Sequence, residues 1–220
     1  MAHLDFISGI HKSTPRDYVQ RVIQYDKAEC AAVSKRFDRD YFDGDRRYGY
    51  GGYQYDGRWV DFAAKLIQHY GLKDGDSVLD IGCGKGFLLK DLKAALPGLN
   101  VAGLDISEYA ITHAEAEIRE FVQSGDAVCL PYPDQSFDLV LSINTLHNLR
   151  LPHLMAAFQE IDRVGRRDKF VVMDSYRNER EKVNLMYWQL TCEAFFTPEE
   201  WAWIFKMVGY KGDHDLIFFE

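Results

Sequence analysis

The segment VLDIGCGKGFLL, residues 78–89, constrains the fold of this chain more than any other stretch. It begins with a short apolar run typical of a buried strand, and a helical pattern starts at its end. Between them, Gly82, Gly84 and Gly86 stand at every second position, where the backbone can turn sharply and a ligand can approach it closely. Amide N–H groups at the start of a helix favour a polar ligand group. We therefore expect a strand, a ligand-binding loop and a helix here.

Strand and helix patterns alternate along the chain from residue 77 onward. The strand patterns occupy residues 77–82, 100–107, 127–130, 137–143 and 169–176. Helical patterns precede, separate and follow them at residues 59–70, 85–96, 107–122, 151–165, 179–194 and 197–209. Alternation at this spacing predicts an α/β fold, in which helices cover both faces of a parallel sheet. Residues 210–220 have room for one last strand or a very tight hairpin.

The chain is expected to divide into an N-terminal cap, residues 1–58, and a main domain, residues 59–220. In the cap, Thr14 and Pro15 predict the start of a helix, because they combine a capping residue with a proline at the first helical position. The apolar stripe of this helix fades near Phe37.

Composition excludes several classes of protein. The chain has 220 residues and a formal net charge of −8, without the basic excess or dense basic face of most nucleic-acid-binding proteins. The four cysteines stand at no metal-ligand spacing, so we expect reduced thiols and no bound metal. Neither a signal peptide nor an apolar run of membrane-spanning length is recognisable. We expect a cytoplasmic monomer or homodimer that acts on a small molecule, without nucleic-acid or membrane partners.

The spacing of the glycines distinguishes two classes of cofactor. A dinucleotide-binding loop has the pattern G-x-G-x-x-G, whose third glycine lets the helix pack closely against the strand. Here the pattern is G-x-G-x-G, Phe87 stands where that third glycine would be, and Asp80 precedes Gly82 by two residues. In both respects the segment resembles motif I of the class I S-adenosylmethionine-dependent methyltransferases. The resemblance implies S-adenosylmethionine as the cofactor.

A second segment extends this resemblance. GDAVCLPYPDQSFDLVLS, residues 125–142, is similar to the run G-D-A-x-x-L-P-F-x-D-x-S-F-D of the ubiquinone/menaquinone-type methyltransferases. That likeness implies that Asp126 meets the adenine amino group, with the backbone of Ala127 beside it. Asp105 ends the second predicted strand, where a carboxylate can accept both ribose hydroxyls. The residues expected to bind the cofactor are Tyr53, Asp80, Gly82, Cys83, Gly84, Gly86, Asp105, Ile106, Asp126, Ala127 and Asn144.

The resemblance also implies a Rossmann-like class I methyltransferase fold with a mostly parallel, seven-stranded sheet. Only eleven residues follow Gly209, so the strand pair that closes such a sheet is either very short or incomplete. An incomplete pair would leave a bare sheet edge, through which two copies of the chain could pair.

The segment NTLHNL, residues 144–149, resembles the family's loop beside the methionine end of the cofactor. The family often has two adjacent histidines there, whereas this chain has His147 followed by Asn148. Because the carboxyl ends of parallel strands meet the ligand crevice, His147 is a candidate catalytic base. The alternative is a packed histidine without a chemical role.

The stretch YGYGGYQYDGRW, residues 48–59, combines glycines with aromatic rings and fits neither a helix nor a strand. In methyltransferases that this chain resembles, the segment before the sheet often folds over the methionine end of the cofactor. We therefore predict a lid in which Tyr48, Tyr50 or Tyr53 faces the reacting groups, with Tyr50 as a catalytic candidate. The alternative is a surface turn packed on the first helix.

The acceptor of the methyl group is less strongly marked than the cofactor. Arg58, Arg150 and residues 174–180 are polar enough for a small hydrophilic acceptor such as a sugar or a secondary metabolite. We expect methylation of an oxygen or nitrogen atom. The alternatives are C-methylation of a quinone-like or polyketide-like acceptor and a non-catalytic module that only binds S-adenosylmethionine.

Overall fold

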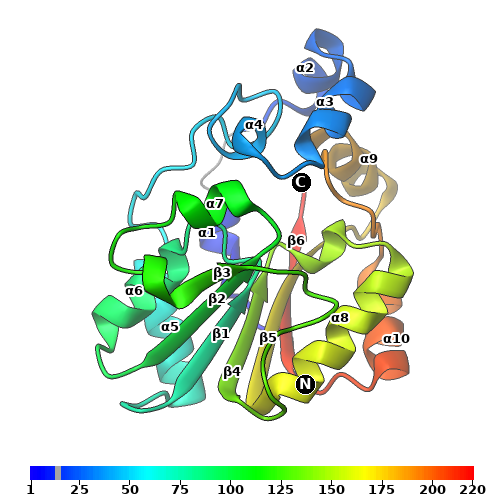
Figure 1. Cartoon of the computed structure of the whole chain (residues 1–220). Coiled ribbons are helices and arrows are strands. Elements are labelled where there is room, and N and C mark those ends of the chain that lie inside the picture. The colour runs from blue at the N-terminus through cyan, green and yellow to red at the C-terminus, as the bar shows by residue number, and fades with distance from the viewer. Residues whose placement is uncertain (13–15) are drawn as a thin grey trace.

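One six-stranded sheet forms the centre of the protein (Figure 1). This computed structural model describes residues 1–12 and 16–220. The strands are β1 (Ser77–Ile81), β2 (Asn100–Asp105), β3 (Val122–Ser124), β4 (Phe137–Ile143), β5 (Gly165–Ser175) and β6 (Asp213–Phe218). They pair in the order β3-β2-β1-β4-β5-β6, and every neighbouring pair is parallel. The order reverses between β1 and β4, so a ligand crevice is expected at the carboxyl ends of these two strands.

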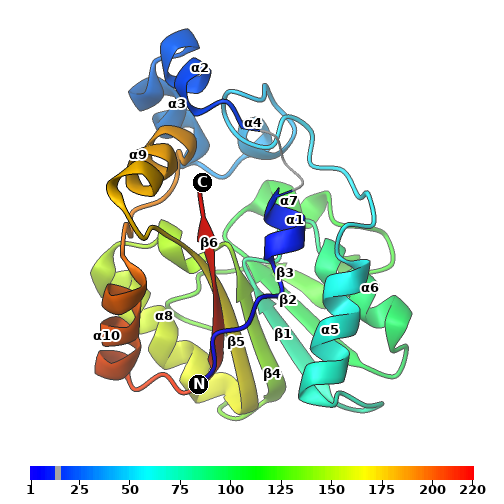
Figure 2. The ribbon, with the colours of Figure 1, turned by 180° about the vertical axis from the view of Figure 1, so that it is seen from behind.

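Helices cover both faces of the sheet (Figures 1 and 2). On one face lie α1 (Ser8–Lys12), α5 (Val60–Tyr70) and α6 (Phe87–Ala95), and on the other lie α8 (Leu151–Val164) and α10 (Pro198–Val208). All residues of β4 are buried, as its continuous apolar run predicts for a strand covered on both sides. Leu139 packs in the core beneath α5 and α6, and its neighbour Val140 packs in the core beneath α8 and α10. The predicted α/β architecture is confirmed.

The N-terminal region lies over the carboxyl ends of the strands, together with two later helices (Figure 1). Its helices are α2 (Tyr18–Gln24), α3 (Lys27–Ser34) and α4 (Arg39–Phe42), and the later ones are α7 (Glu108–Thr112) and α9 (Glu179–Trp188). The single long helix predicted here is wrong, because the backbone is extended at Tyr25 and Asp26 begins a new helix by accepting a hydrogen bond from the N–H of Glu29. The predicted helix start at Thr14 and Pro15 lies outside the described residues.

The third strand also differs from the prediction. The helix expected to reach residue 122 ends at Thr112, and the strand expected at residues 127–130 lies earlier, at β3. The carboxylate of Asp126 accepts a hydrogen bond from the N–H of Val128 (3.1 Å), and this turn takes residues 127–130 out of the sheet. Helix α9 likewise ends at Trp188 instead of residue 194.

The sheet ends at β6, which pairs with β5 as a single parallel strand. Within residues 1–12 and 16–220 there is no seventh strand. The N-terminal residues instead run beside β6 (Figure 2): the N–H of Leu4 donates to the carbonyl of His214 (2.8 Å), and the N–H of His214 donates to the carbonyl of Ala2 (3.0 Å). The open edge that an incomplete strand pair would leave is therefore covered in part by the chain's own N-terminal residues, which weakens the argument for a dimer paired through that edge.

Asp215 attaches the N-terminal segment to this edge. Its buried carboxylate accepts hydrogen bonds from the N–H groups of Phe6 (2.7 Å) and Ile7 (2.9 Å). We predict that Asp215→Ala lowers the free energy of unfolding by about 1–3 kcal/mol, because it leaves two backbone donors without an acceptor. Thermal melting measures the loss, and hydrogen exchange at Ile7 locates it. Asp5→Ala is the matched control, since Asp5 is an exposed carboxylate of the same segment; equal melting temperatures for the two variants would contradict this role of Asp215.

Candidate active site

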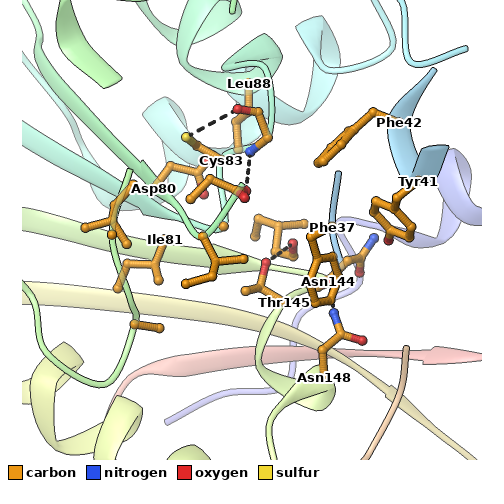
Figure 3. Close-up of a pocket in the computed structure, with 18 of the residues that line it drawn as sticks. Phe37, Tyr41, Phe42, Asp80, Ile81, Cys83, Leu88, Asn144, Thr145 and Asn148 are labelled. Carbon is orange, nitrogen blue, oxygen red and sulfur yellow. Dashed lines mark hydrogen bonds between the residues drawn. The ribbon is translucent and has the colours of Figure 1, made fainter. Parts of the chain in front are cut away.

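A cavity of about 220 Å³ opens at the carboxyl ends of β1, β2 and β4, and we call it the first cavity. Figure 3 shows Asp80 and Ile81 on one side of it and Tyr41 and Phe42, from the N-terminal region, on the other. The predicted cofactor residues that line it are Tyr53, Asp80, Gly82, Cys83, Gly84, Asp105, Ile106, Asp126, Ala127 and Asn144.

Gly86 is the predicted cofactor residue that the structure places outside this lining. It precedes α6 with a left-handed φ of 78°, and a Cβ there would lie 2.8 Å from Cγ2 of Ile118. Glycine is therefore needed at this position for the turn and for packing, instead of for contact with a ligand in the cavity.

The glycine loop after β1 is held by the end of β2. The N–H of Gly84 donates to Asp105 Oδ2 (2.8 Å), and the N–H of Ser107 donates to Asp105 Oδ1 (2.9 Å). Gly82 has a φ of 82°, and a Cβ on it would lie 1.9 Å from Oγ1 of Thr145, so only glycine fits between the two loops. Each carboxylate oxygen of Asp105 is thereby fixed and still has acceptor capacity for a ligand.

Asp80, near the end of β1, has an unusual electrostatic environment. Its side chain is buried, and its Oδ1 has no hydrogen-bond partner in the part of the chain that the structure describes. Burial, and to a smaller extent the nearby carboxylate of Asp105, raises the pKa of Asp80 to about 7. A buried carboxylate oxygen without a donor is costly, so this position favours a ligand that brings a cationic donor.

The aromatic stretch of residues 48–59 lies over the glycine loop. The ring of Tyr53 stacks on Phe87 with the centroids 4.6 Å apart, and the ring of Tyr50 lies 4.3 Å from that of Tyr53. Tyr50 and Tyr53 line the first cavity, whereas Tyr48 is not among its described lining residues. Two of the three tyrosines of the predicted lid are therefore placed beside the glycine loop.

A buried ion pair, which the sequence analysis missed, joins this stretch to the glycine loop. Lys85 Nζ lies 2.7 Å from Asp43 Oδ2 and also donates to the carbonyl of Tyr53 (2.8 Å). Asp43 accepts further hydrogen bonds from the N–H of Tyr53 (2.9 Å) and the hydroxyl of Tyr109 (2.8 Å). A lysine between two loop glycines is the signal that the sequence offers for this contact.

A second cavity, of about 280 Å³, adjoins the first. The two cavities share the lining residues Tyr41, Tyr50, Tyr53, Trp59, Asn144 and Asn148. His147, Arg58 and Asp174 also line the second cavity. Arg150, another polar candidate, does not appear in its described lining, and its side chain is 79% exposed.

The residues shared by the two cavities include several unpaired polar atoms. In the described part of the chain, no hydrogen-bond partner faces Trp59 Nε1, Asn144 Oδ1 or Asn148 Oδ1, although all three atoms are buried. Asn144 also has a left-handed φ of 57°, which residues other than glycine seldom adopt. Figure 3 shows Asn144 and Asn148 together at the cavity wall. Unpaired buried groups and backbone strain in one place are typical of a functional site.

His147 follows β4 in the 3₁₀ turn η2 (Leu146–Asn148) and is buried. Its Nδ1 accepts a hydrogen bond from the N–H of Asp174 (3.1 Å), which assigns the ring proton to Nε2, 3.3 Å from Asp174 Oδ2. Burial lowers the pKa of His147 and raises the pKa of Asp174. Both ring nitrogens are thus engaged with one residue, so this geometry favours the packed histidine over the catalytic base, the two alternatives left open by the sequence.

The structure shows no site for a metal ion: across residues 1–12 and 16–220, no three His, Cys, Asp or Glu side chains are grouped as ligands. In the same residues, no helix combines the length and apolar composition needed to cross a bilayer. The candidate site consists of the two adjoining cavities and the side chains that line them.

Comparisons with known proteins agree with this geometry. Residues 79–173 match the family described as "Methyltransferase domain". The chain is 38% identical over 122 residues to sterol 24-C-methyltransferase ERG6B of Gibberella zeae. The aligned region covers 49% of this chain and 31% of that protein. It is 37% identical over 112 residues to demethylmenaquinone methyltransferase of Lactobacillus johnsonii. Here the aligned region covers 47% of this chain and 45% of that protein. The chain thus spans less than half the length of these curated relatives.

A solved structure agrees at the level of the fold. The YcgJ protein of Bacillus subtilis superposes with a TM-score of 0.55 over 66% of each chain, at 22% sequence identity. Similarity at this identity shows the fold alone. Residues 79–173, which carry several of the motifs that line the first cavity, are thus similar to the methyltransferase domain.

Proposed function

We propose that this protein transfers a methyl group from S-adenosylmethionine to an oxygen or nitrogen atom of a small polar acceptor. The observation that carries the proposal is the pair of adjoining cavities, one lined by the cofactor motifs and the other by polar side chains. They meet at shared residues that include Trp59, Asn144 and Asn148, each with one buried polar atom that has no partner in the described part of the chain. Donor and acceptor can therefore approach each other across one boundary, which methyl transfer requires.

The residues of the first cavity fit S-adenosylmethionine. The carboxylate of Asp105 is oriented by two backbone N–H groups and has acceptor capacity left for the two ribose hydroxyls. The unpaired Oδ1 of Asp80 suits the ammonium group of the methionine part, because a cationic donor offsets the cost of burying that oxygen. Asp126 and Ala127 follow β3 and supply a polar group and an apolar surface for the adenine.

The boundary between the cavities suits a positively charged donor. The cofactor, when bound, supplies a methyl group already activated by its sulfonium charge. The rings of Tyr50 and Tyr53 and the amide oxygens of Asn144 and Asn148 lie at this boundary, and such electron-rich groups favour positive charge. The lid holds these rings over the glycine loop, where they reduce the access of water to the reacting groups.

Asp174 is the group best placed to take a proton from the acceptor. Its carboxylate lines the second cavity and is fixed by Nε2 of His147 and by the amide of Gln189 (2.5 Å). Burial raises the pKa of Asp174, which makes it a stronger proton acceptor than an exposed aspartate. His147 then acts as a positioning residue, because it orients this carboxylate without touching the acceptor's proton.

Methylation at carbon is the alternative, because the relative from Gibberella zeae is named a sterol 24-C-methyltransferase. The lining of the second cavity favours a polar acceptor instead. It includes the charged or polar side chains of His11, Arg16, Arg21, Arg46 and Asp174. An apolar acceptor would displace water from the donors of Arg21 and Arg46 that their backbone contacts leave over, which is costly.

We predict that the protein binds S-adenosylmethionine, and that Asp80→Asn weakens this binding while it raises the stability of the fold. The pKa of Asp80 rises from 3.8 to about 7 on folding, so the stability of the wild type falls as the pH rises between these values. The variant has no buried charge and should therefore be more stable than the wild type at pH 8, with the gain vanishing near pH 4. Its affinity for S-adenosylmethionine should fall about tenfold or more. Thermal melting and calorimetry measure the two effects.

NADH and Asp61→Asn, which changes an exposed carboxylate of α5, are the controls for this experiment. Binding of NADH without binding of S-adenosylmethionine would overturn the proposed function. An Asp80→Asn protein that binds the cofactor as well as the wild type would show that Asp80 does not contact it.

The lid generates a second prediction about cofactor binding. Tyr50→Ala should weaken binding of S-adenosylmethionine by about tenfold with little loss of stability, because this ring is 40% exposed. Tyr53→Phe tests the hydroxyl alone and keeps the stacking on Phe87. Tyr48→Phe is the matched control from the same stretch. Calorimetry measures the affinity, and melting temperatures measure the stability. Unchanged affinity in both lid variants would show that residues 48–59 have only a structural role.

Asp174→Asn should slow methyl transfer by about 100-fold while cofactor affinity stays unchanged, because the variant lacks the proton acceptor. Release of S-adenosylhomocysteine with an acceptor found in a metabolite screen measures the rate. In the wild type, the rate should fall at acid pH as Asp174 is protonated, and the loss should begin above the usual range of an aspartate because burial raises this pKa. Equal rates and equal pH profiles for the two proteins would exclude Asp174 as the base.

A further inference from the structure

The second cavity has an excess of positive charge, although the whole chain has a formal net charge of −8. Its described lining contains the arginines Arg16, Arg21, Arg46 and Arg58, and Asp174 is the one carboxylate among the described lining residues. Arg58 is neutralised outside this set by Asp56, with 2.6 Å between Nη2 and Oδ2. Three guanidinium groups therefore face one carboxylate across this cavity.

These three guanidinium groups gather around one tryptophan ring. The distances from Cζ to the centroid of Trp188 are 5.3 Å for Arg16, 4.7 Å for Arg21 and 5.4 Å for Arg46. The arginines come from three separate segments: the chain before α2, α2 itself and the turn after α4. Contact with an aromatic face orients a guanidinium and offsets part of its desolvation.

Backbone carbonyl groups hold the arginines further. Arg16 Nη1 donates to the carbonyl of His11 (3.0 Å), Arg21 Nε donates to the carbonyl of Trp188 (2.9 Å), and Arg46 Nη1 donates to the carbonyl of Gly49. Within the described residues, Arg21 and Arg46 form no ion pair with a carboxylate. A guanidinium has five N–H donors, so these contacts fix the groups of Arg21 and Arg46 and leave donors on both for a ligand.

The electrostatics of neighbouring groups agree with a cluster whose positive charge the one carboxylate of Asp174 offsets only in part. Burial, and then the charge of Arg46, lowers the pKa of Arg21. Burial, and then the charge of Arg16, lowers the pKa of His11 to about 4, so this histidine is neutral near pH 7. Like charges held together in a partly buried cavity repel one another, and an anionic ligand would relieve that repulsion.

We infer that the second cavity binds an acceptor that carries an oxyanion, either a carboxylate or a phosphate, seated against Arg21, Arg46 and Arg16 beside Trp188. The inference rests on the proposed function and names the class of its substrate. Planar guanidinium groups match carboxylate and phosphate oxygens better than any other common ligand group. The same cavity extends to Asp174 and to the shared tyrosines, so the anionic end would hold the acceptor while its other end meets the boundary with the first cavity.

The position of Arg46 connects this subsite to the lid. Arg46 donates to the carbonyl of Gly49, the residue before Tyr50. A Cβ on Gly49 would lie 2.1 Å from the carbonyl oxygen of Tyr41, so the backbone passes close to α4 here and has little freedom to move away. An oxyanion bound at Arg46 would therefore also steady the tyrosines that face both cavities.

The test measures binding of small oxyanions to the full chain saturated with S-adenosylhomocysteine. Inorganic phosphate, pyrophosphate and succinate are titrated at constant ionic strength, with sodium chloride as the reference, and thermal melting and calorimetry record binding. The phosphate and succinate arms distinguish the two kinds of oxyanion. We expect at least one of them to bind, and Arg21→Gln and Arg46→Gln to weaken it each by about tenfold. Arg47→Gln is the matched control, because Arg47 adjoins Arg46 in the chain but is not among the described lining residues of the second cavity.

The outcomes separate this inference from the proposed function. If S-adenosylhomocysteine fails to bind to the wild type, the proposed function fails first. If it binds but no oxyanion raises the melting temperature above the chloride reference, the inference is overturned while the proposed function stands. Equal oxyanion affinity in the wild type and both arginine variants would overturn it as well. Unchanged binding of S-adenosylhomocysteine by Arg21→Gln shows that this variant is folded.

Discussion

The buried ion pair between Lys85 and Asp43 is the contact on which the rest of the site depends. Lys85 lies between two glycines of the loop after β1, so the turn that shapes the first cavity also places its ammonium group. Asp43 and the carbonyl of Tyr53 meet that ammonium from the opposite wall. Removing Asp43 would leave the buried ammonium group of Lys85 without its carboxylate, and an uncompensated buried charge typically costs about 3–5 kcal/mol. Because this contact joins the glycine loop to the aromatic stretch of residues 48–59, the position of each of these two segments depends on the other.

The periodicity of apolar residues predicted the strands and helices that are buried in the core. The strands β1, β2, β4 and β5 and the helices beside them follow from apolar runs and their spacing, since a strand covered on both faces has few alternatives. Two of the failures occur where one polar side chain overrides the pattern. Asp26 interrupts the N-terminal helix by capping a new one, and Asp126 turns the chain away from the sheet where a strand was expected. The apolar residues around both aspartates fit a continuous element, so the pattern alone favours the wrong one.

The same contrast separates the two halves of the site. The first cavity is built mainly from one continuous strand–loop–helix unit and the ends of neighbouring strands, so all but one of the cofactor residues predicted from sequence motifs line it. The second cavity combines arginines of the N-terminal region with Asp174 at the end of β5 and Trp188 of α9, and no spacing in the sequence connects these positions. His147 illustrates the limit. Its place after β4 follows from the sequence, but its role depends on the N–H of Asp174, a residue of the neighbouring strand.

The N-terminal region is tied to the sheet at two distant points, and this explains why it forms part of the site. Residues 2–7 lie against β6, whose outer backbone groups would otherwise be exposed, and Asp215 fixes them there. At the other end of the region, Asp43 is bound to Lys85 of the glycine loop. Between these anchors, residues 16–42 lie over the carboxyl ends of the strands and supply Arg16 and Arg21 to the second cavity. These residues lie outside the matched methyltransferase domain at residues 79–173. Much of the first cavity therefore comes from the matched domain, and much of the second cavity comes from a segment outside it.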